Sequence, residues 1–238
     1  NSIGAGWTNW GGAQVSETSQ QLRITSTTAA AYYGADRASS NNLDETFLGS
    51  HLVDAGNQSL TSLEVYPILA SVDTDNSIYW LVTGNTINCY TEIATTFTNR
   101  RTITYDSSQH KYFAVGEIGG NILWLWSPDG THWRTAFSLS NPFGTTTVIA
   151  TLMLGTWQTE ASGSTAIWDD FSSWSSTINV TITQATSTGT ANATTAAKTV
   201  TNSQATDSET ATLAVLSKSV AAVESVESGA AQPITINK

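Results

Sequence analysis

The chain of 238 residues has a net charge of -10, a pI of about 4.5 and only 12% charged residues. An acidic protein repels phosphate backbones and anionic lipids, so nucleic acid and anionic membranes are poor candidates as partners. The single cysteine, Cys89, excludes an intrachain disulfide, and no apolar run reaches the roughly 18 residues that a membrane-spanning helix needs.

Residues 1–175 carry every aromatic side chain of the protein and are expected to form strands throughout. The expected strands are short, rich in β-branched and aromatic residues, and separated by Gly, Asn, Asp, Ser or Pro. They cover residues 21–25, 60–70, 77–82, 111–115, 121–127, 146–154 and 165–171. Many short strands with no competing helical period predict a β-sandwich or a barrel.

The stretch LWLWSPDGTHW, residues 123–133, predicts a tight hairpin. Pro128 suits the second position of a type I turn, and Gly130 suits the bulge that follows it. This combination predicts a three-residue loop in which Ser127 lies opposite Thr131.

The same register assigns the aromatic residues of the hairpin to two faces. Trp124 then lies opposite Arg134, Trp126 lies opposite His132, and directly opposed residues share a face. Rings beside a guanidinium and an imidazole are typical of a contact surface, so we expect these four residues to be partly exposed. Trp133 falls on the apolar face and is expected in the core. A slip of one residue would exchange the two faces.

A further aromatic residue is expected at the surface in AIWDDF, residues 166–171. If Phe171 is in the core, strand alternation turns Trp168 outward, together with Asp170. The simpler interpretation of any one of these tryptophans is that it packs inside the sandwich.

Residues 176–238 form a second region without aromatic side chains. Several residue types recur there every 20 positions, including Lys198, Lys218 and Lys238, and Val180, Val200 and Val220. One such unit has little apolar surface to bury, so we expect it to stack on its neighbours or on sister chains, as a β fibre or stalk and as a trimer. The alternative is a disordered Ser/Thr/Ala-rich linker.

Three segments together resemble a known family. EIGGNILWLWSPDGTHWRTAF, VIATLMLGTW and STAIWDDFSSW, in this order, are similar to the end of a concanavalin A-like, laminin-G-like jelly roll, and the resemblance covers residues 1–174. It implies an all-β jelly-roll β-sandwich over residues 1–175, followed by a repetitive β stalk over 176–238. The tail pattern resembles 20-residue repeats of phage tail and fibre proteins, which implies that the chain is a piece of a longer virion polypeptide.

The same resemblance implies a calcium site. Jelly rolls of this kind often bind Ca2+ through acidic residues near the chain start and in the D-D-F strand, which implies Asp169 or Asp170 as a ligand, with Asp73 or Asp75 as more distant candidates. Calcium takes six to eight oxygens, and these carboxylates alone are too few. The alternative is that they are ordinary surface groups at a strand end.

Catalytic carboxylates are not expected. Glycanases of this jelly-roll class carry an E-x-D-x-x-E strand, which places the acid and the nucleophile on one face. No such spacing occurs here, and Glu64 and Glu117 are isolated on their strands. The sequence therefore predicts that the protein is not an enzyme.

The function expected from the sequence is glycan binding or adhesion by a structural module at a virion surface or an extracellular surface. Its partners would be a host-surface or neighbouring glycan and other virion subunits. A structural decoration or assembly module without a ligand is one alternative, and a glycoside hydrolase is another. The expected glycan-binding residues are Trp124, Trp126, His132, Arg134 and Trp168.

Overall fold

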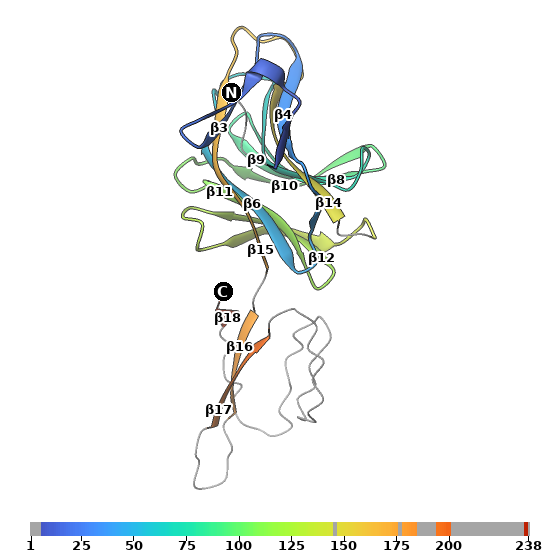
Figure 1. Ribbon diagram of the computed structural model, residues 1–238, viewed down its shortest axis with the longest axis vertical. Coiled ribbons are helices and arrows are strands. Elements are labelled where there is room, and N and C mark those ends of the chain that lie inside the picture. Colours follow the sequence, from blue (N-terminus) through green and yellow to red (C-terminus); the bar gives the residue numbers. More distant parts are fainter. Residues whose placement is uncertain (1–5, 145–146, 176–177, 185–193, 201–235, 238) are drawn as a thin grey trace. The chain divides into compact units, whose positions relative to one another are not determined.

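The computed structural model describes residues 6–144, 147–175, 178–184, 194–200 and 236–237. The chain divides into two units, Asn1–Trp174 and Ser175–Lys238, of which the first holds two large antiparallel sheets (Figure 1). The predicted jelly-roll β-sandwich is confirmed for this unit, and each of the seven strands expected from the sequence is present. In the described part of the chain, no helix is long and apolar enough to cross a membrane.

One layer, called sheet A, contains eight strands. Their spatial order is β1 (Trp7–Asn9), β4 (Ala31–Arg37), β14 (Thr147–Thr156), β7 (Leu63–Ser71), β8 (Ser77–Thr83), β9 (Thr86–Ile93) and β10 (Thr96–Thr104), with β5 (Asn41–Asn42) paired to β14. Because β14 inserts between β4 and β7, sheet A brings together segments that lie far apart in the sequence.

The opposite layer, sheet B, contains seven strands. Their order is β13 (Arg134–Ser140), β12 (Asn121–Ser127), β11 (Tyr112–Ile118), β6 (Thr46–Asp54), β15 (Thr165–Ser175), β3 (Gln21–Thr25) and β2 (Val15–Thr18). A short 3-10 helix, η1 (Gly12–Gln14), precedes β2.

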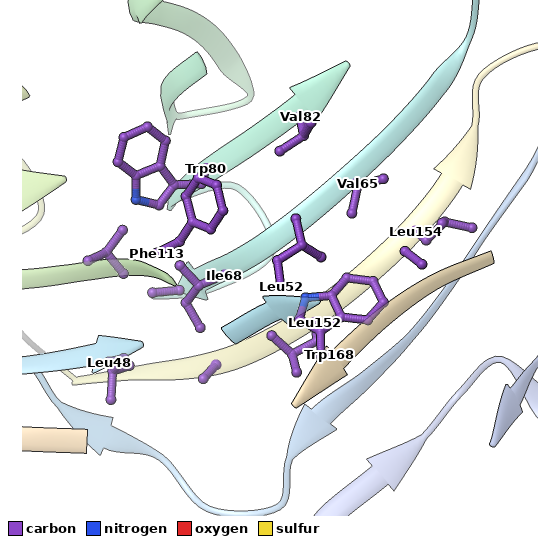
Figure 2. Packing of buried hydrophobic residues seen from close by; sticks show 14 of the residues in the cluster. Leu48, Leu52, Val65, Ile68, Trp80, Val82, Phe113, Leu152, Leu154 and Trp168 are labelled. Carbon is purple, nitrogen blue, oxygen red and sulfur yellow. The ribbon is translucent and has the colours of Figure 1, made fainter. Parts of the chain in front are cut away.

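The core fills the space between the two sheets, and alternation along each strand supplies it. On β8, Ile78, Trp80 and Val82 point inward and are almost fully buried. Figure 2 shows Trp80 beside Phe113 of sheet B, and their ring centroids lie 5.4 Å apart.

Two buried indoles also link the sheets through hydrogen bonds. Trp80 Nε1 on sheet A donates to the carbonyl of Ala114 on sheet B at 2.9 Å. Trp124 Nε1 on sheet B donates to the carbonyl of Tyr79 on sheet A at 3.0 Å. Each ring therefore fills the core while its polar atom is satisfied, which is the usual condition for burying tryptophan.

The hairpin register predicted for residues 123–133 is wrong. Trp126 lies opposite Arg134, and a bulge then places Trp124 opposite Phe137. The connection is longer than predicted because side chains close it. Asp129 accepts hydrogen bonds from the backbone N–H groups of Thr131 and His132, both at 2.8 Å.

The outward direction predicted for two tryptophans is also wrong. Trp124 is 0% exposed and Trp168 is 1% exposed, and both belong to the core between the sheets. For Trp168 the parity argument fails at Asp170, whose φ of 36° interrupts the alternation of β15, so that Trp168 and Phe171 both pack against the core. Figure 2 shows Trp168 among the leucines of that core.

Trp133 occupies the opposite position from the one predicted. Its ring is half-buried on the outer face of sheet B, where it packs with Leu125 and Trp174. The pairing of residues into faces along β12 was correct, since Trp124 and Leu125 do lie on opposite sides. The face assigned to the core was the wrong one.

The second unit is described in three short strands. They are β16 (Ile178–Gln184), β17 (Thr194–Val200) and β18 (Ile236–Asn237), in the antiparallel order β17-β16-β18. Lys198 of β17 lies opposite Val180 of β16. Most of the predicted 20-residue repeat, including Lys218, lies outside the described residues, so the stalk and its trimer stay predictions.

Candidate functional site

The glycan-binding surface expected from the sequence is not assembled. Trp124 and Trp168 are in the core, and their strands are separated by β11 and β6. Trp126 is half-buried, with its ring 4.4 Å from that of His110 and the Arg134 guanidinium 4.9 Å from its centroid. Of the expected aromatic surface at the hairpin, only the Trp126 ring remains partly accessible, and the Arg134 guanidinium lies over it.

His132 takes part in loop closure. Its Nδ1 lies 2.7 Å from a carboxylate oxygen of Asp129, and its side chain is exposed. Hydrogen bonds from the backbone and side chain of His132 and from the Thr131 backbone hold the pKa of Asp129 well below its usual range. The polar groups of this loop are thus used within the loop.

The carboxylates predicted to bind metal lie on sheet B near His51. Burial lowers the pKa of His51 below its ordinary value, and the negative charges of Asp169 and Asp170 offset only part of this shift. His51 itself stacks on Tyr112, with ring centroids 4.2 Å apart. No carboxylate partner within a metal-binding cluster accompanies Asp169 or Asp170 among the described residues, and their role as ligands stays a prediction.

A cluster of acidic side chains does form, at another place. Carboxylate oxygens of Asp44, Glu45 and Glu117 lie within 4.8 Å of one another, between the start of β6 and the end of β11. Glu45 accepts the Gly119 N–H at 3.0 Å, and Glu117 accepts the Gly120 N–H. Oxygen ligands of this kind suit a hard cation such as Ca2+, which needs several more than these three carboxylates.

The most distinctive side-chain arrangement is on the outer face of sheet A. Tyrosines from β4, β7, β8 and β9 lie there in a row, next to one carboxylate. We call this group the tyrosine face and define it as Tyr32, Tyr66, Tyr79, Tyr90 and Glu64.

Strand register places all five side chains on one side of the sheet. Gly155 of β14 lies between Tyr32 and Glu64, opposite both, and directly opposed residues share a face. Tyr79 is likewise opposite Tyr90. The inward neighbours of these residues fill the core, so the tyrosines must point away from it.

The rings contact one another in sequence across the sheet. The centroids of Tyr32 and Tyr66 are 6.4 Å apart, those of Tyr66 and Tyr79 are 5.3 Å apart, and Tyr79 stacks on Tyr90 at 5.3 Å with an angle of 3° between planes. Tyr66 is 8% exposed and Tyr79 is 5% exposed, whereas the outer two rings are half-buried. The row is therefore a packed layer in which the two middle rings are almost fully buried and the two outer rings are partly accessible.

Glu64 is held by two phenols. The hydroxyl groups of Tyr32 and Tyr66 both donate to its Oε2, at 2.6 Å and 2.8 Å. Burial, together with the hydrogen bond to Glu64 and its negative charge, raises the pKa of Tyr32 above its ordinary value. Burial and the charge of Glu64 do the same to Tyr66. Both phenols therefore stay protonated as donors at neutral pH.

Glycine makes room for the first ring. A Cβ at Gly155 would lie 2.2 Å from Cδ1 of Tyr32, so the ring rests directly on the backbone of β14. The same arrangement occurs at Gly34, where a Cβ would lie 2.3 Å from the Trp10 ring. Trp10, 43% exposed, thereby extends the aromatic surface over β4.

Further carboxylates flank the tyrosine face. Asp36 accepts hydrogen bonds from Trp10 Nε1 at 3.1 Å and from the Thr151 hydroxyl at 2.7 Å. Glu92 accepts one from the Ser77 hydroxyl at 3.0 Å, and its charge adds to burial in raising the pKa of Tyr79.

Sequence reasoning missed this site. It recognised Glu64 as a lone carboxylate, and the simple alternation of Tyr79, Trp80 and Leu81 does not show which of them points outward. Two signals were available: the outward parity of Tyr79 once Trp80 is placed in the core, and the spacing of Glu64 and Tyr66, which puts both on one face of their strand. The two-residue turn Gly84-Asn85 places Tyr90 of β9 opposite Tyr79, whereas the partner on β4 is brought in by strand order.

Comparison with known proteins identifies the fold. No family model and no curated protein sequence matches the chain. Among solved structures, a GH43 protein, BlXynB from Bacillus licheniformis, in its K247S mutant form, is similar with a TM-score of 0.58 and 14% identity, over 74% of this chain and 38% of that chain.

Two further structures are similar over most of their own length. The carbohydrate binding module CBM66 from Bacillus subtilis has a TM-score of 0.50 and 10% identity, over 71% of this chain and 96% of that one. The exoplasmic/lumenal domain of VIP36, in a Ca2+/Man3GlcNAc-bound form, has a TM-score of 0.51 and 12% identity, over 72% and 84%. At these identities the comparisons establish the jelly-roll fold.

These neighbours correct one prediction. The inference that the protein is not an enzyme is wrong, because several chains with this fold are glycoside hydrolases. The missing E-x-D-x-x-E strand rules out one arrangement of carboxylates and leaves others, since a sheet face can collect acidic groups from several strands, as Glu64 and Glu92 show.

Proposed function

We propose that the protein binds carbohydrate on the tyrosine face. The observation that carries this proposal is the row of contacting phenol rings around Glu64 on the outer face of sheet A. Sugar rings present flat C–H surfaces next to hydroxyl groups, and they are recognised by aromatic surfaces with a few fixed polar groups. The tyrosine face offers both.

The rigidity of the site supports the proposal. Tyr66 and Tyr79 are packed by neighbours on both sides, and Glu64 is fixed by two hydrogen bonds. Side chains that are already ordered lose little conformational freedom when a ligand binds. The neighbour named as a carbohydrate binding module and the Man3GlcNAc-bound VIP36 domain are compatible with this use of the fold.

We further propose that this binding serves adhesion at an extracellular or virion surface. The low content of charged residues and the net charge of -10 support such a location. An antibody against residues 1–174 should label intact particles or cells of the source. Labelling that requires permeabilisation would contradict the proposal.

The binding test uses the full chain on a glycan array, followed by titration calorimetry with the best ligand. Tyr90→Ala removes a half-buried ring from the tyrosine face and should weaken binding tenfold or more, since a buried aromatic anchor is typically worth about 2 kcal/mol. Its melting temperature should change little.

Tyr112→Ala is the matched control. Tyr112 is also a half-buried, stacked tyrosine, but it lies on sheet B. If it weakens binding as much as Tyr90→Ala does, or if neither variant has an effect, the tyrosine face is not the site. Release of reducing sugar from the bound glycan, measured in the same samples, shows whether binding is accompanied by hydrolysis.

A further inference from the structure

We infer that the tyrosine face selects neutral glycans and rejects acidic ones, because three carboxylates lie on or beside it and Tyr32 and Tyr66 use their hydroxyl protons on Glu64, which leaves only acceptors around that residue. This inference rests on the proposed carbohydrate binding and adds the class of ligand to it.

The hydrogen-bonding capacity around Glu64 follows from the two phenol bonds. A phenol has one proton to donate, and both Tyr32 and Tyr66 donate it to Oε2 of Glu64. What remains on the phenol oxygens is lone pairs, and a carboxylate is an acceptor only. Among the described residues, Oε1 of Glu64 receives no hydrogen bond. A ligand at this point must therefore bring its own donors.

The flanking groups have the same character. The hydroxyl protons of Ser77 and Thr151 are directed to Glu92 and Asp36, and the indole N–H of Trp10 also goes to Asp36. These flanking groups thus repeat the pattern around Glu64, with donors already used and carboxylates presented. Among the described residues, the hydroxyl groups of Tyr79 and Tyr90 donate to none of these carboxylates.

Charge acts in the same direction. Asp36, Glu64 and Glu92 are all acidic, and they belong to a chain with a net charge of -10. The guanidinium of Arg100 on the neighbouring β10 donates from Nε to Thr91, which is opposite the core residue Ile78 and so lies on the inner side of sheet A. A sugar carboxylate or sulfate would meet like charges and acceptors, whereas sugar hydroxyls can donate to Glu64.

The experiment compares matched pairs of polysaccharides. Neutral glucan, mannan and galactan are each prepared in a second form in which the C6 hydroxymethyl group has been oxidised to a carboxylate. The full-length protein should bind at least one neutral polymer and bind its oxidised form at least tenfold more weakly, which corresponds to about 1.4 kcal/mol.

Glu64→Gln tests the residue responsible. The amide removes the charge and adds two donors while keeping the shape of the side chain. The variant should bind the neutral polymer more weakly and the oxidised polymer more tightly than the wild type does, so that the ratio of the two affinities falls. Tyr112→Ala, on sheet B, should leave that ratio unchanged.

The outcomes separate this inference from the proposed function. Equal or tighter binding of the oxidised polymers, in a manner that Tyr90→Ala abolishes, would overturn the selectivity and leave carbohydrate binding intact. If no polymer of either form binds in a Tyr90-dependent manner, carbohydrate binding at the tyrosine face is itself wrong.

Discussion

Two groups of packed aromatic side chains differ in what their polar atoms do. Trp80 and Trp124 lie between the sheets, and their indole N–H groups donate to backbone carbonyls of the opposite sheet. Tyr32 and Tyr66 lie on the outside of sheet A, and their hydroxyl groups donate to a carboxylate.

The hydrogen-bond partner distinguishes a structural role from a binding role. The exposed fraction of the side chain does not. Trp124 and Tyr66 are 0% and 8% exposed, so burial alone would assign both to the core. A backbone carbonyl as the partner indicates a link within the scaffold. A fixed side-chain carboxylate at the outer surface can also take a hydrogen bond from a ligand, so the partner identifies the candidate site.

The largest effect is expected from the core group. Trp124→Ala removes a fully buried ring and its bond to Tyr79, and should reduce the free energy of unfolding by about 3–5 kcal/mol. Urea unfolding followed by circular dichroism measures it. Trp157→Ala, in which the lost ring is 58% exposed, should change the same quantity by less than about 0.5 kcal/mol. Similar losses in both variants would show that Trp124 is not a core residue.

The next effect concerns the support of the tyrosine face. Gly155→Ala would place a methyl group against the Tyr32 ring, which has to move and release Glu64, at a cost of about 1–3 kcal/mol. Ligand binding should fall as well. The control is the double variant with Tyr32→Ala, in which the contact with the ring is removed and the contact with the Ala31 carbonyl oxygen remains, so that the cost of Gly155→Ala should fall in part. Additive costs would mean that the ring does not rest on Gly155.

A smaller effect is expected at the outer face of sheet B. Trp133 is half-buried and packs on Trp174 with ring centroids 5.0 Å apart, so Trp133→Ala should cost about 1–2 kcal/mol. This is less than the cost of Trp124→Ala measured in the same urea experiment. A larger loss for Trp133 than for Trp124 would restore the face assignment expected from the sequence.

The smallest effect expected is the change of stability with pH that tyrosine ionisation causes. Burial raises the pKa of Tyr105 from 10.0 to about 12, and the pKa values of Tyr32 and Tyr66 are raised as well. A raised pKa in the folded state means that the unfolded chain loses its phenol protons first, so this contribution to stability is complete below pH 10 and declines as the pH rises above it.

Absorbance at alkaline pH follows these ionisations directly. Glu64→Gln should lower the pKa of Tyr32, because a negative charge and its hydrogen bond are removed. The Tyr105 ionisation should stay where it is, since its shift comes from burial and from Asp54 and Asp106. An unchanged titration curve in the variant would contradict the bonds at Glu64.

Local sequence patterns were sufficient for the strands and for single backbone positions. Each expected segment is a strand because β-branched and aromatic residues suit a pleated, half-buried surface. Gly130 has the positive φ, 75°, that the turn sequence requires. The opposition of Trp124 and Leu125 across β12 also follows from alternation alone.

Which face of a strand is buried was decided by the tertiary structure. Alternation gives two sets of residues, but the core is the set that meets the second sheet, and that sheet is built from distant segments. At Trp168 a single irregular residue, Asp170, was enough to reverse the prediction. The closure of the hairpin by the Asp129 side chain likewise altered a register that turn geometry alone had suggested.

The sequence by itself determined an all-β protein with its aromatic residues confined to the first 175 positions. Only the tertiary structure decided that four tyrosines and Glu64 form one surface. They come from strands spread over residues 31–93, and the β4 tyrosine meets Glu64 only because β14 inserts between β4 and β7. Non-local pairing of this kind is selected by the burial of the opposite face of the sheet, which no local pattern around Glu64 records.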